Sequence, residues 1–382
     1  MHARRPSPPW SRSTPWLALA VPLALSGLVA CGGGEGDDDG GDVDAAGGGG
    51  GPPTLPGTPG QWSWVDVPGT RCMNGSATGF GVNLGTSADL VLYMQGGGAC
   101  FNDFTCSSVA NPNGFTGADL ASAVAQGGTE GLFDRGDAAN PLRDATFVFF
   151  PYCSGDVFAG SAESGYGGRV QVGYQNVGAY LDVIVPASTP VRRVIVSGSS
   201  AGGFGALYNY DRVATRYPGL PVFLIDDSGP PMADTWLTPC LQTQMRTHWN
   251  LNATLPTDCS ACVGQDGGGL VNAMPFLADK HSQQRMALLS SVSDGVIRSF
   301  YGFGYPTCSS ISPMPAQAFS DGLADLRTRV LAGKDNFRVF SLGGGGHVWL
   351  FNDFSTTMAG GQSMGAWLGA MLDGSAWDHA GP

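Results

Sequence analysis

Six near-continuous apolar runs follow one another along the chain from residue 90 onward. They are LVLYMQ (90–95), ATFVFFPY (145–152), RRVIVSGS (192–199), PVFLIDD (221–227), RMALLSSV (285–292) and FRVFSLG (337–343). Strands that are buried on both faces of a parallel sheet have this unbroken apolar character. Apolar residues at helical spacing occupy 176–189 and 205–219. Strands that alternate with helices predict an α/β protein with a mostly parallel sheet flanked by helices.

The pattern also divides the chain into three segments. Residues 1–30 have a basic start and an apolar stretch that is too short, and too interrupted by Pro22, to span a membrane. This is typical of a signal peptide. Residues 31–60 are rich in Gly, Asp and Pro, which predicts a flexible tether. Residues 61–382 are long enough for one large core, and we expect them to form a single domain.

The signal-like segment ends in Leu28-Val29-Ala30-Cys31, which resembles a bacterial lipobox. Lipidation of Cys31 would anchor the chain to a membrane surface without spanning it. The alternative is an ordinary secretory signal with a chance cysteine. We therefore expect an exported protein, lipid-anchored in the bacterial cell envelope at the outer membrane or cell surface.

Charge excludes one class of partner. The formal net charge is −12, and lysine occurs only at Lys280 and Lys334, so no basic patch offers itself to nucleic acid. The expected partners are an ester substrate, with acetylated polysaccharide as the candidate, and the membrane through the lipid. We expect a monomer that needs no metal or cofactor.

Eight cysteines remain when Cys31 is set aside, and an even number in an exported chain favours four disulfides. Zinc binding at the C-x-x-C of residues 259–262 would need a second pair of closely spaced cysteines, but Cys240 and Cys308 stand alone. A redox role would need the motif to open a helix after a strand, whereas it follows a polar stretch. Residues 228–280 have little periodicity and predict an insertion or cap over the sheet. Connectivity stays open, although the short spacing of Cys100 and Cys106 favours one pair. The candidates are Cys72, Cys100, Cys106, Cys153, Cys240, Cys259, Cys262 and Cys308.

Two stretches match G-x-S-x-G, centred on Ser200 and Ser363. Ser200 follows a β-branched run and precedes a helical segment. Ser363 follows NDFSTTMAG, which does not resemble a strand. A nucleophile elbow needs a sharp strand-to-helix turn, so Ser200 is the predicted nucleophile. The alternative for Ser200 is a glycine-rich turn with an idle hydroxyl.

A serine nucleophile needs a base and an acid that orients the base. His347 follows a predicted strand and a GGGG loop. A catalytic base in such a loop could reach a serine at the end of another strand. Asp226 and Asp227 end the first strand after the elbow, and Asp294 follows the second. The acid usually lies after the second strand, so position favours Asp294, whose alternative role is to cap the next helix.

The oxyanion of an acyl-transfer reaction needs backbone donors. Gly96-Gly97-Gly98 directly follows the strand at 90–95, as in an HGGG-type loop. The N–H groups of Gly97 and Gly98, with that of Ala201 after the nucleophile, are the predicted donors. The alternative is a plain glycine turn.

Five motifs together resemble the pectin acetylesterase family, which includes plant pectin acetylesterases and Notum-like carboxylesterases. In chain order they are LYMQGGGACFNDFTC, FFPYCSGDVFAG, VSGSSAGGFGAL, SSVSDGVIRSFYG and GGGGHVWL, within about residues 61–360. The resemblance implies an α/β-hydrolase fold and ester hydrolysis by a triad that falls on Ser200, Asp294 and His347. The family's oxyanion loop falls on Gly97 and Gly98. Family members usually carry a Trp beside this glycine run, whereas Gly98-Ala99 stands here, so substrate identity does not carry over.

These observations predict an exported serine carboxylesterase, with acetyl as the expected acyl group. A lipase or polyester depolymerase would use the same triad and differ in its acyl pocket: a short acetyl needs a shallow pocket, and a long chain needs an apolar groove. A protein of another class, a catalytically inactive surface-binding lipoprotein, would not need the complete Ser, acid and His set.

Overall fold

The computed structural model describes residues 54–188, 190–309 and 311–382. The predicted signal peptide, most of the predicted tether and Cys31 lie outside the described residues. The main sheet has eight strands in the order β1-β2-β4-β3-β5-β6-β7-β8. Their bounds are β1 Trp62–Arg71, β2 Ala77–Asn83, β3 Asp89–Met94, β4 Thr146–Phe150, β5 Arg193–Ser199, β6 Val222–Asp227, β7 Met286–Ser291 and β8 Phe337–Leu342.

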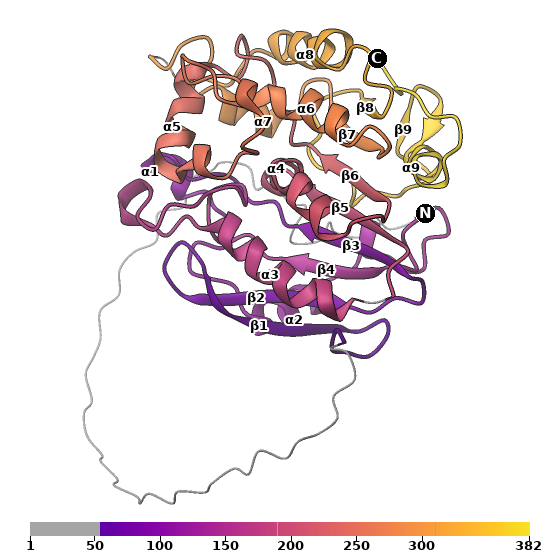
Figure 1. Ribbon diagram of the computed structural model, residues 1–382. Helices are drawn as coiled ribbons and strands as arrows, with labels where there is room; N and C mark the ends of the chain where they lie inside the picture. The colour runs from indigo at the N-terminus through magenta and orange to yellow at the C-terminus, as the bar shows by residue number, and fades with distance from the viewer. Residues whose placement is uncertain (1–53, 189, 310) are drawn as a thin grey trace, which may run out of the picture.

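The six apolar runs form the six strands β3 to β8, which confirms the predicted mostly parallel sheet (Figure 1). The sequence analysis did not find β1 and β2, which pair antiparallel with each other, with β2 also antiparallel to β4. β1 is an edge strand with exposed side chains, and the buried strand β2 (ATGFGVN) has small and polar residues between its apolar ones. Neither strand therefore has the continuous apolar character of the central strands.

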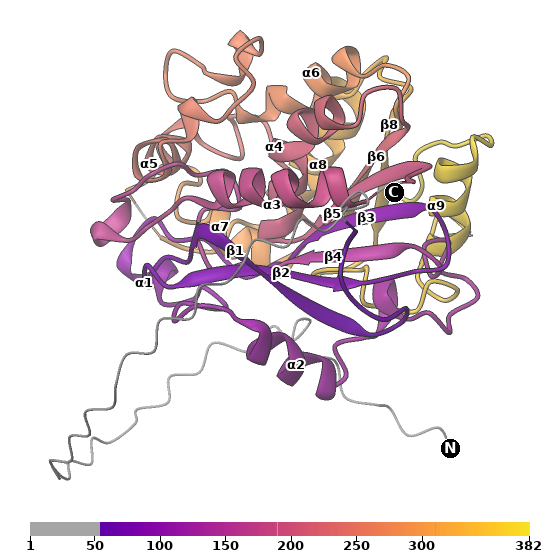
Figure 2. The ribbon, with the colours of Figure 1, turned by 60° about the horizontal axis from the view of Figure 1, so that its bottom comes forward.

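Helices cover both faces of the sheet. The α3 and α2 helices lie on opposite faces (Figure 2). Within the described residues, none of the helices is both long and apolar enough to cross a bilayer. The helices are α1 Asp103–Cys106, α2 Gly117–Ala125, α3 Gly173–Ala187, α4 Ala201–Arg216, α5 Pro239–Trp249, α6 Ala273–Lys280, α7 Gly295–Tyr301, α8 Ala316–Asp325 and α9 Met364–Asp373. Short pieces complete the chain, namely 3₁₀ turns at Gly131–Phe133, Tyr166–Gly168, Leu251–Ala253, Ser260–Cys262 and Leu270–Asn272, a π turn at Leu326–Val330, and the strand pair β9 Met358–Ala359 and β10 Gln362–Ser363.

Alternate residues of each central strand enter different halves of the core. Val194 and Val196 of β5 pack in the half that contains α3, α4 and α6, whereas Ile195 packs in the half that contains α9. Successive side chains of a strand point to opposite faces, so burial on both faces requires apolar residues at every position. This explains why the central strands appear in the sequence as unbroken apolar runs.

The predicted insertion at 228–280 needs one correction. Its first part, with α5 and three single-turn helices, lies beyond the carboxyl end of β6. The α6 helix instead packs against α4 and leads into β7. We therefore place α6 among the crossover helices of the sheet. Its eight residues carry too weak a periodicity to separate it from the irregular segment before it.

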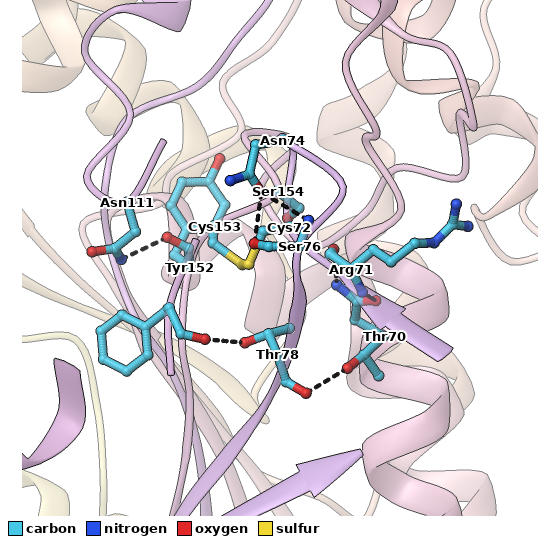
Figure 3. Close-up of a disulfide and its surroundings, with 12 residues drawn as sticks. Thr70, Arg71, Cys72, Asn74, Ser76, Thr78, Asn111, Tyr152, Cys153 and Ser154 are labelled. Atoms are coloured by element: carbon cyan, nitrogen blue, oxygen red, sulfur yellow. Dashed lines mark hydrogen bonds between the residues drawn. A yellow bond between two sulfur atoms is a disulfide. The ribbon is translucent and has the colours of Figure 1, made fainter. Parts of the chain in front are cut away.

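All eight predicted cysteines form four disulfides, which confirms both the predicted number and the Cys100–Cys106 pair. Cys259 bonds to Cys262, and the remaining pairs are Cys72–Cys153 and Cys240–Cys308. Figure 3 shows that Cys72–Cys153 joins the turn between β1 and β2 to the chain after β4. The antiparallel edge of the sheet is thereby attached covalently beside the carboxyl ends of the parallel strands.

Candidate active site

Ser200 stands alone between the last residue of β5 and the first residue of α4. Its backbone adopts φ 59° and ψ −120°, a conformation that is unfavourable for any residue with a side chain. The amide of Ser200 donates to the carbonyl oxygen of Asp227 at 2.7 Å. The turn has the geometry of a nucleophile elbow, in which strain projects the hydroxyl beyond the edge of the sheet.

The two glycines of the motif are required by close packing around this turn. A Cβ at Gly198 would overlap the carbonyl oxygen of Gly202, and one at Gly202 would overlap that of Met94. Met94 ends β3 and pairs with Gly198 in the sheet. The elbow therefore lies directly against the strand that leads into the Gly96–Gly98 loop.

The Gly96–Gly98 loop lies against Ser200. A Cβ added to Gly96 would be 3.1 Å from the Ser200 Cβ, and Gly97 and Gly98 have φ values of 156° and 82°. Among the described residues, the N–H groups of Gly97 and Gly98 donate no hydrogen bond to the protein. Ala201 is the first residue of α4, so its N–H has no acceptor within the helix. Donors are thus available on both sides of the serine.

Gln95 fixes the start of this loop. Its buried side-chain oxygen accepts from the Asn111 amide at 3.0 Å and from the backbone N–H of Tyr152 at 2.9 Å. Asn111 also donates to the carbonyl oxygen of Tyr152, next to Cys153 (Figure 3). The sequence analysis missed Gln95, because no local pattern distinguishes this glutamine from an ordinary end of a strand.

Asp294 and His347 meet at the carboxyl ends of β7 and β8. Asp294 Oδ2 lies 2.7 Å from His347 Nδ1, and the carboxylate is fully buried. The other oxygen, Oδ1, accepts from the amides of Val296 and Ile297 at the start of α7. The aspartate therefore caps α7 and holds the imidazole at the same time. No hydrogen bond joins Ser200 to His347 in this structure.

The other two acid candidates have different contacts. Asp226 accepts from the Gly229 amide, and among the described residues its Oδ2 has no partner. Asp227 accepts from the amides of Trp349 and Leu350, just after His347. Burial raises the pKa of both carboxyls, and hydrogen bonds to Asp227 oppose that rise. Neither carboxylate contacts the His347 ring.

The second serine motif has a structural role. Ser363 Oγ accepts from the Ala366 amide at the start of α9, and the residue ends the two-residue strand β10. Two of the other histidines also have protein partners: His281 lies 2.8 Å from Asp211, and His379 Nδ1 accepts from the Val339 amide. Within the described residues, no group of three His, Cys, Asp or Glu side chains is placed to bind a metal.

A pocket opens beside Ser200. Gly98 and Ala201 line it together with Ser200. Its walls come from α4, α7, the insertion and the chain after β4, and they are apolar and aromatic. They are Val157, Phe204, Tyr208, Leu237, Met245, Trp249, Leu251, Leu270, Ile297, Phe300 and Tyr301. Residues of the insertion therefore form part of the pocket beside Ser200.

The chain is similar in sequence to curated carboxylesterases. Palmitoleoyl-protein carboxylesterase NOTUM of Schmidtea mediterranea is 31% identical over 157 residues, which cover 38% of this chain and 29% of that protein. The Homo sapiens NOTUM is 29% identical over 171 residues, which cover 41% and 34%. The aligned stretch spans about a third of the length of these curated relatives.

The fold is shared with a solved relative. The Drosophila Wnt deacylase Notum superposes with a TM-score of 0.59 over 81% of this chain and 93% of that chain, at 19% identity. This likeness confirms the predicted α/β-hydrolase fold. The family model for pectinacetylesterases matches residues 64–261, which are more than half of the chain. The protein therefore belongs to the pectinacetylesterase family.

Proposed function

We propose that the protein is a serine carboxylesterase that cleaves esters of apolar acyl chains. The observation that carries the proposal is the apolar pocket that opens at Ser200. The serine on the elbow, the free amides of the glycine loop and the hydrogen-bonded Asp294–His347 pair support the same chemistry. Family membership supports ester hydrolysis independently of this geometry.

In the proposed reaction, Ser200 Oγ attacks the ester carbonyl carbon while His347 Nε2 removes the hydroxyl proton. The carbonyl oxygen becomes an oxyanion, which the N–H groups of Gly97, Gly98 and Ala201 would bind. The tetrahedral intermediate then expels the alcohol, which takes the proton from the imidazolium. A water molecule, deprotonated by the same ring, attacks the acyl-enzyme. The second tetrahedral intermediate then collapses and releases the carboxylic acid. The imidazolium returns a proton to the serine oxygen, which restores the hydroxyl.

Asp294 orients the ring for both steps. Its contact with Nδ1 leaves Nε2 as the nitrogen that can exchange a proton with Ser200. The missing Ser200–His347 hydrogen bond is compatible with this role, because catalytic hydrogen bonds often tighten only when substrate binds.

The pocket favours an acyl chain longer than acetyl. An acetyl group would leave the walls formed by Met245, Trp249 and Leu270 without contact, whereas a longer chain would bury apolar surface against them. The relatives named palmitoleoyl-protein carboxylesterases are consistent with a long acyl substrate. The expected acetyl specificity, and acetylated polysaccharide as the substrate, stay untested predictions.

We also propose that the enzyme acts outside the cytoplasm, attached to the cell envelope through a lipid on Cys31. The lipobox-like end of the signal segment supports this placement. Four disulfides in the folded domain support an oxidising compartment.

The test compares wild type with Ser200→Ala and Ser363→Ala. A fluorophosphonate probe should label wild type and Ser363→Ala but not Ser200→Ala. Among p-nitrophenyl esters, kcat/KM should rise from acetate to medium-length chains. Ser363→Ala should lose only about 1 kcal/mol of stability, because it removes a helix cap. A kcat/KM that falls steadily from acetate would favour an acetylesterase, and labelling of Ser200→Ala would reject the nucleophile.

A further inference from the structure

Three residues around the end of β6 have positive φ values without being glycine. Ser200 has φ 59°, Ser228 has φ 63° and Val348 has φ 57°. Val348 directly follows His347. A β-branched residue is an outlier in this region and stays there only when its surroundings hold it. The conformation of the loop that carries His347 therefore depends on contacts from elsewhere in the fold.

The contacts come from Asp227 and Ser228. Ser228 Oγ accepts from the Val348 amide at 3.1 Å. The Asp227 carboxylate accepts from the Trp349 amide at 2.9 Å and from the Leu350 amide at 3.0 Å. Three successive N–H groups after His347 are thus bound by two adjacent, fully buried residues. Buried amides need acceptors, and these two residues supply them for all three N–H groups.

The same pair is connected to the nucleophile. The Asp227 carboxylate accepts from Ser199 Oγ at 2.8 Å, and its carbonyl oxygen accepts from the Ser200 amide at 2.7 Å. Ser228 Oγ donates to the carboxylate at 3.0 Å. Asp227 therefore contacts the elbow with its backbone and the base loop with its side chain. Among the described residues, Asp227 thus bonds to both the elbow at Ser199–Ser200 and the loop after His347, and no hydrogen bond joins these two segments directly.

We propose that Asp227 and Ser228 are positioning residues, which set His347 at the distance and angle to Ser200 that proton transfer requires. This proposal rests on the proposed esterase function and deepens it. Asp294 orients the imidazole ring, whereas Asp227 and Ser228 place the backbone on which the ring is carried. Small displacements of a catalytic group can lower a rate by about 10²-fold, so loss of this support should appear in kcat.

Asp226→Asn is the matched control. Asp226 is the neighbouring residue and is equally buried, but none of its contacts reaches residues 347–350. Asn in place of Asp227 cannot accept two amides with its NH₂ group. Ser228→Ala removes only one hydroxyl and gives a second variant that should fold. The measurements are kcat and KM on a p-nitrophenyl ester, melting temperature, and amide hydrogen exchange of residues 348–350.

We expect Ser228→Ala and Asp227→Asn to lower kcat roughly tenfold to hundredfold with KM within about twofold, since the acyl pocket is untouched. Exchange at residues 348–350 should accelerate about tenfold or more in both, and Asp226→Asn should match wild type. Wild-type kcat in Ser228→Ala, or unchanged exchange, overturns the proposal. So does an equal loss in Asp226→Asn. An inactive wild type that the fluorophosphonate does not label would instead reject the esterase function, and the exchange data would still report on the loop.

Discussion

Asp294 uses its two carboxylate oxygens for different purposes. Oδ1 accepts the amides of Val296 and Ile297, and Oδ2 meets Nδ1 of His347. The sequence presents these as competing interpretations, a helix cap or a catalytic acid. The geometry allows both, because the oxygens of one carboxylate point in different directions. The cap also keeps the carboxylate from rotating away from the ring.

Asp294→Asn can separate the two roles, the cap of α7 and the orientation of the His347 ring. The Asn side-chain oxygen can still cap α7, but its NH₂ group facing Nδ1 would favour the wrong imidazole tautomer. We expect kcat to fall roughly 10³- to 10⁴-fold with little change in melting temperature. Asp294→Ala should lose similar activity and about 1 kcal/mol of additional stability through the lost cap. Turnover of Asp294→Asn within tenfold of wild type would remove Asp294 from the triad.

His379 provides a pH-dependent contribution to stability. Its Nδ1 accepts from the Val339 amide of β8. Burial, followed by nearby Arg327 and Arg338, lowers the pKa of His379 from 6.5 to about 4. As the pH falls below 6.5, the unfolded chain takes up a proton that the folded chain does not accept until about pH 4. The stabilisation is therefore complete above pH 6.5 and is lost toward pH 4.

We expect this loss to disappear when His379 is replaced by Gln, which can still accept the Val339 amide. The difference in melting temperature between wild type and His379→Gln should be constant above about pH 7. Between about pH 6.5 and 4, the melting temperature of wild type should fall relative to that of His379→Gln. Thermal melts of both proteins across this range measure it, and a constant difference throughout would show that His379 titrates normally.

One α5 side chain joins several parts of the insertion. Arg246 donates to the carbonyl oxygens of Cys262, Gly267 and Gly268 at 2.7–2.8 Å, and also to the side chain of Asn252. Its helix neighbour Met245 lines the acyl pocket. The buried guanidinium thus connects α5 to three backbone carbonyls of a segment that has little regular structure of its own.

Arg246→Met should therefore change chain-length selectivity. Methionine keeps an apolar stem but none of the hydrogen bonds, so the pocket wall should loosen. We expect KM for p-nitrophenyl octanoate to rise roughly tenfold while acetate hydrolysis stays within about twofold. Arg285→Met is the control, because Arg285 likewise binds carbonyls, of Ala370, Gly374 and Ser375, but away from the pocket. Equal effects on both esters would show that Arg246 supports the fold in general.

At the level of the entire protein, the proposed membrane attachment would depend on the segment before the folded domain. If Cys31 carries a lipid, wild type expressed in a bacterial host should label with palmitate and partition into detergent. Cys31→Ser should do neither while it keeps its esterase activity, because the domain from about residue 61 contains all the site residues. Equal membrane association of the two proteins would reject lipidation.

Interactions that are local in the chain could be predicted from the residues alone. The six apolar runs specify strands because burial on both faces requires apolar side chains at every position. The elbow at Ser200 is recognisable because strand, turn and helix are contiguous. Cys100 and Cys106 pair because few residues separate them. The antiparallel edge formed by β1 and β2 escaped prediction, since β1 is partly exposed and the buried strand β2 has small and polar residues between its apolar ones.

Contacts between distant segments were decided by the tertiary structure. Asp226, Asp227 and Asp294 are the same residue type, and in the sequence only strand position and the family resemblance favoured Asp294. The sheet order brings β7 beside β8, so Asp294 reaches the His347 ring, and β6 is left to bind the backbone of the same loop. The apolar pocket likewise exists only because the insertion folds over α4 and α7. The order of the strands and the paths of the crossover connections determine these long-range contacts, and no local pattern of residues encodes them.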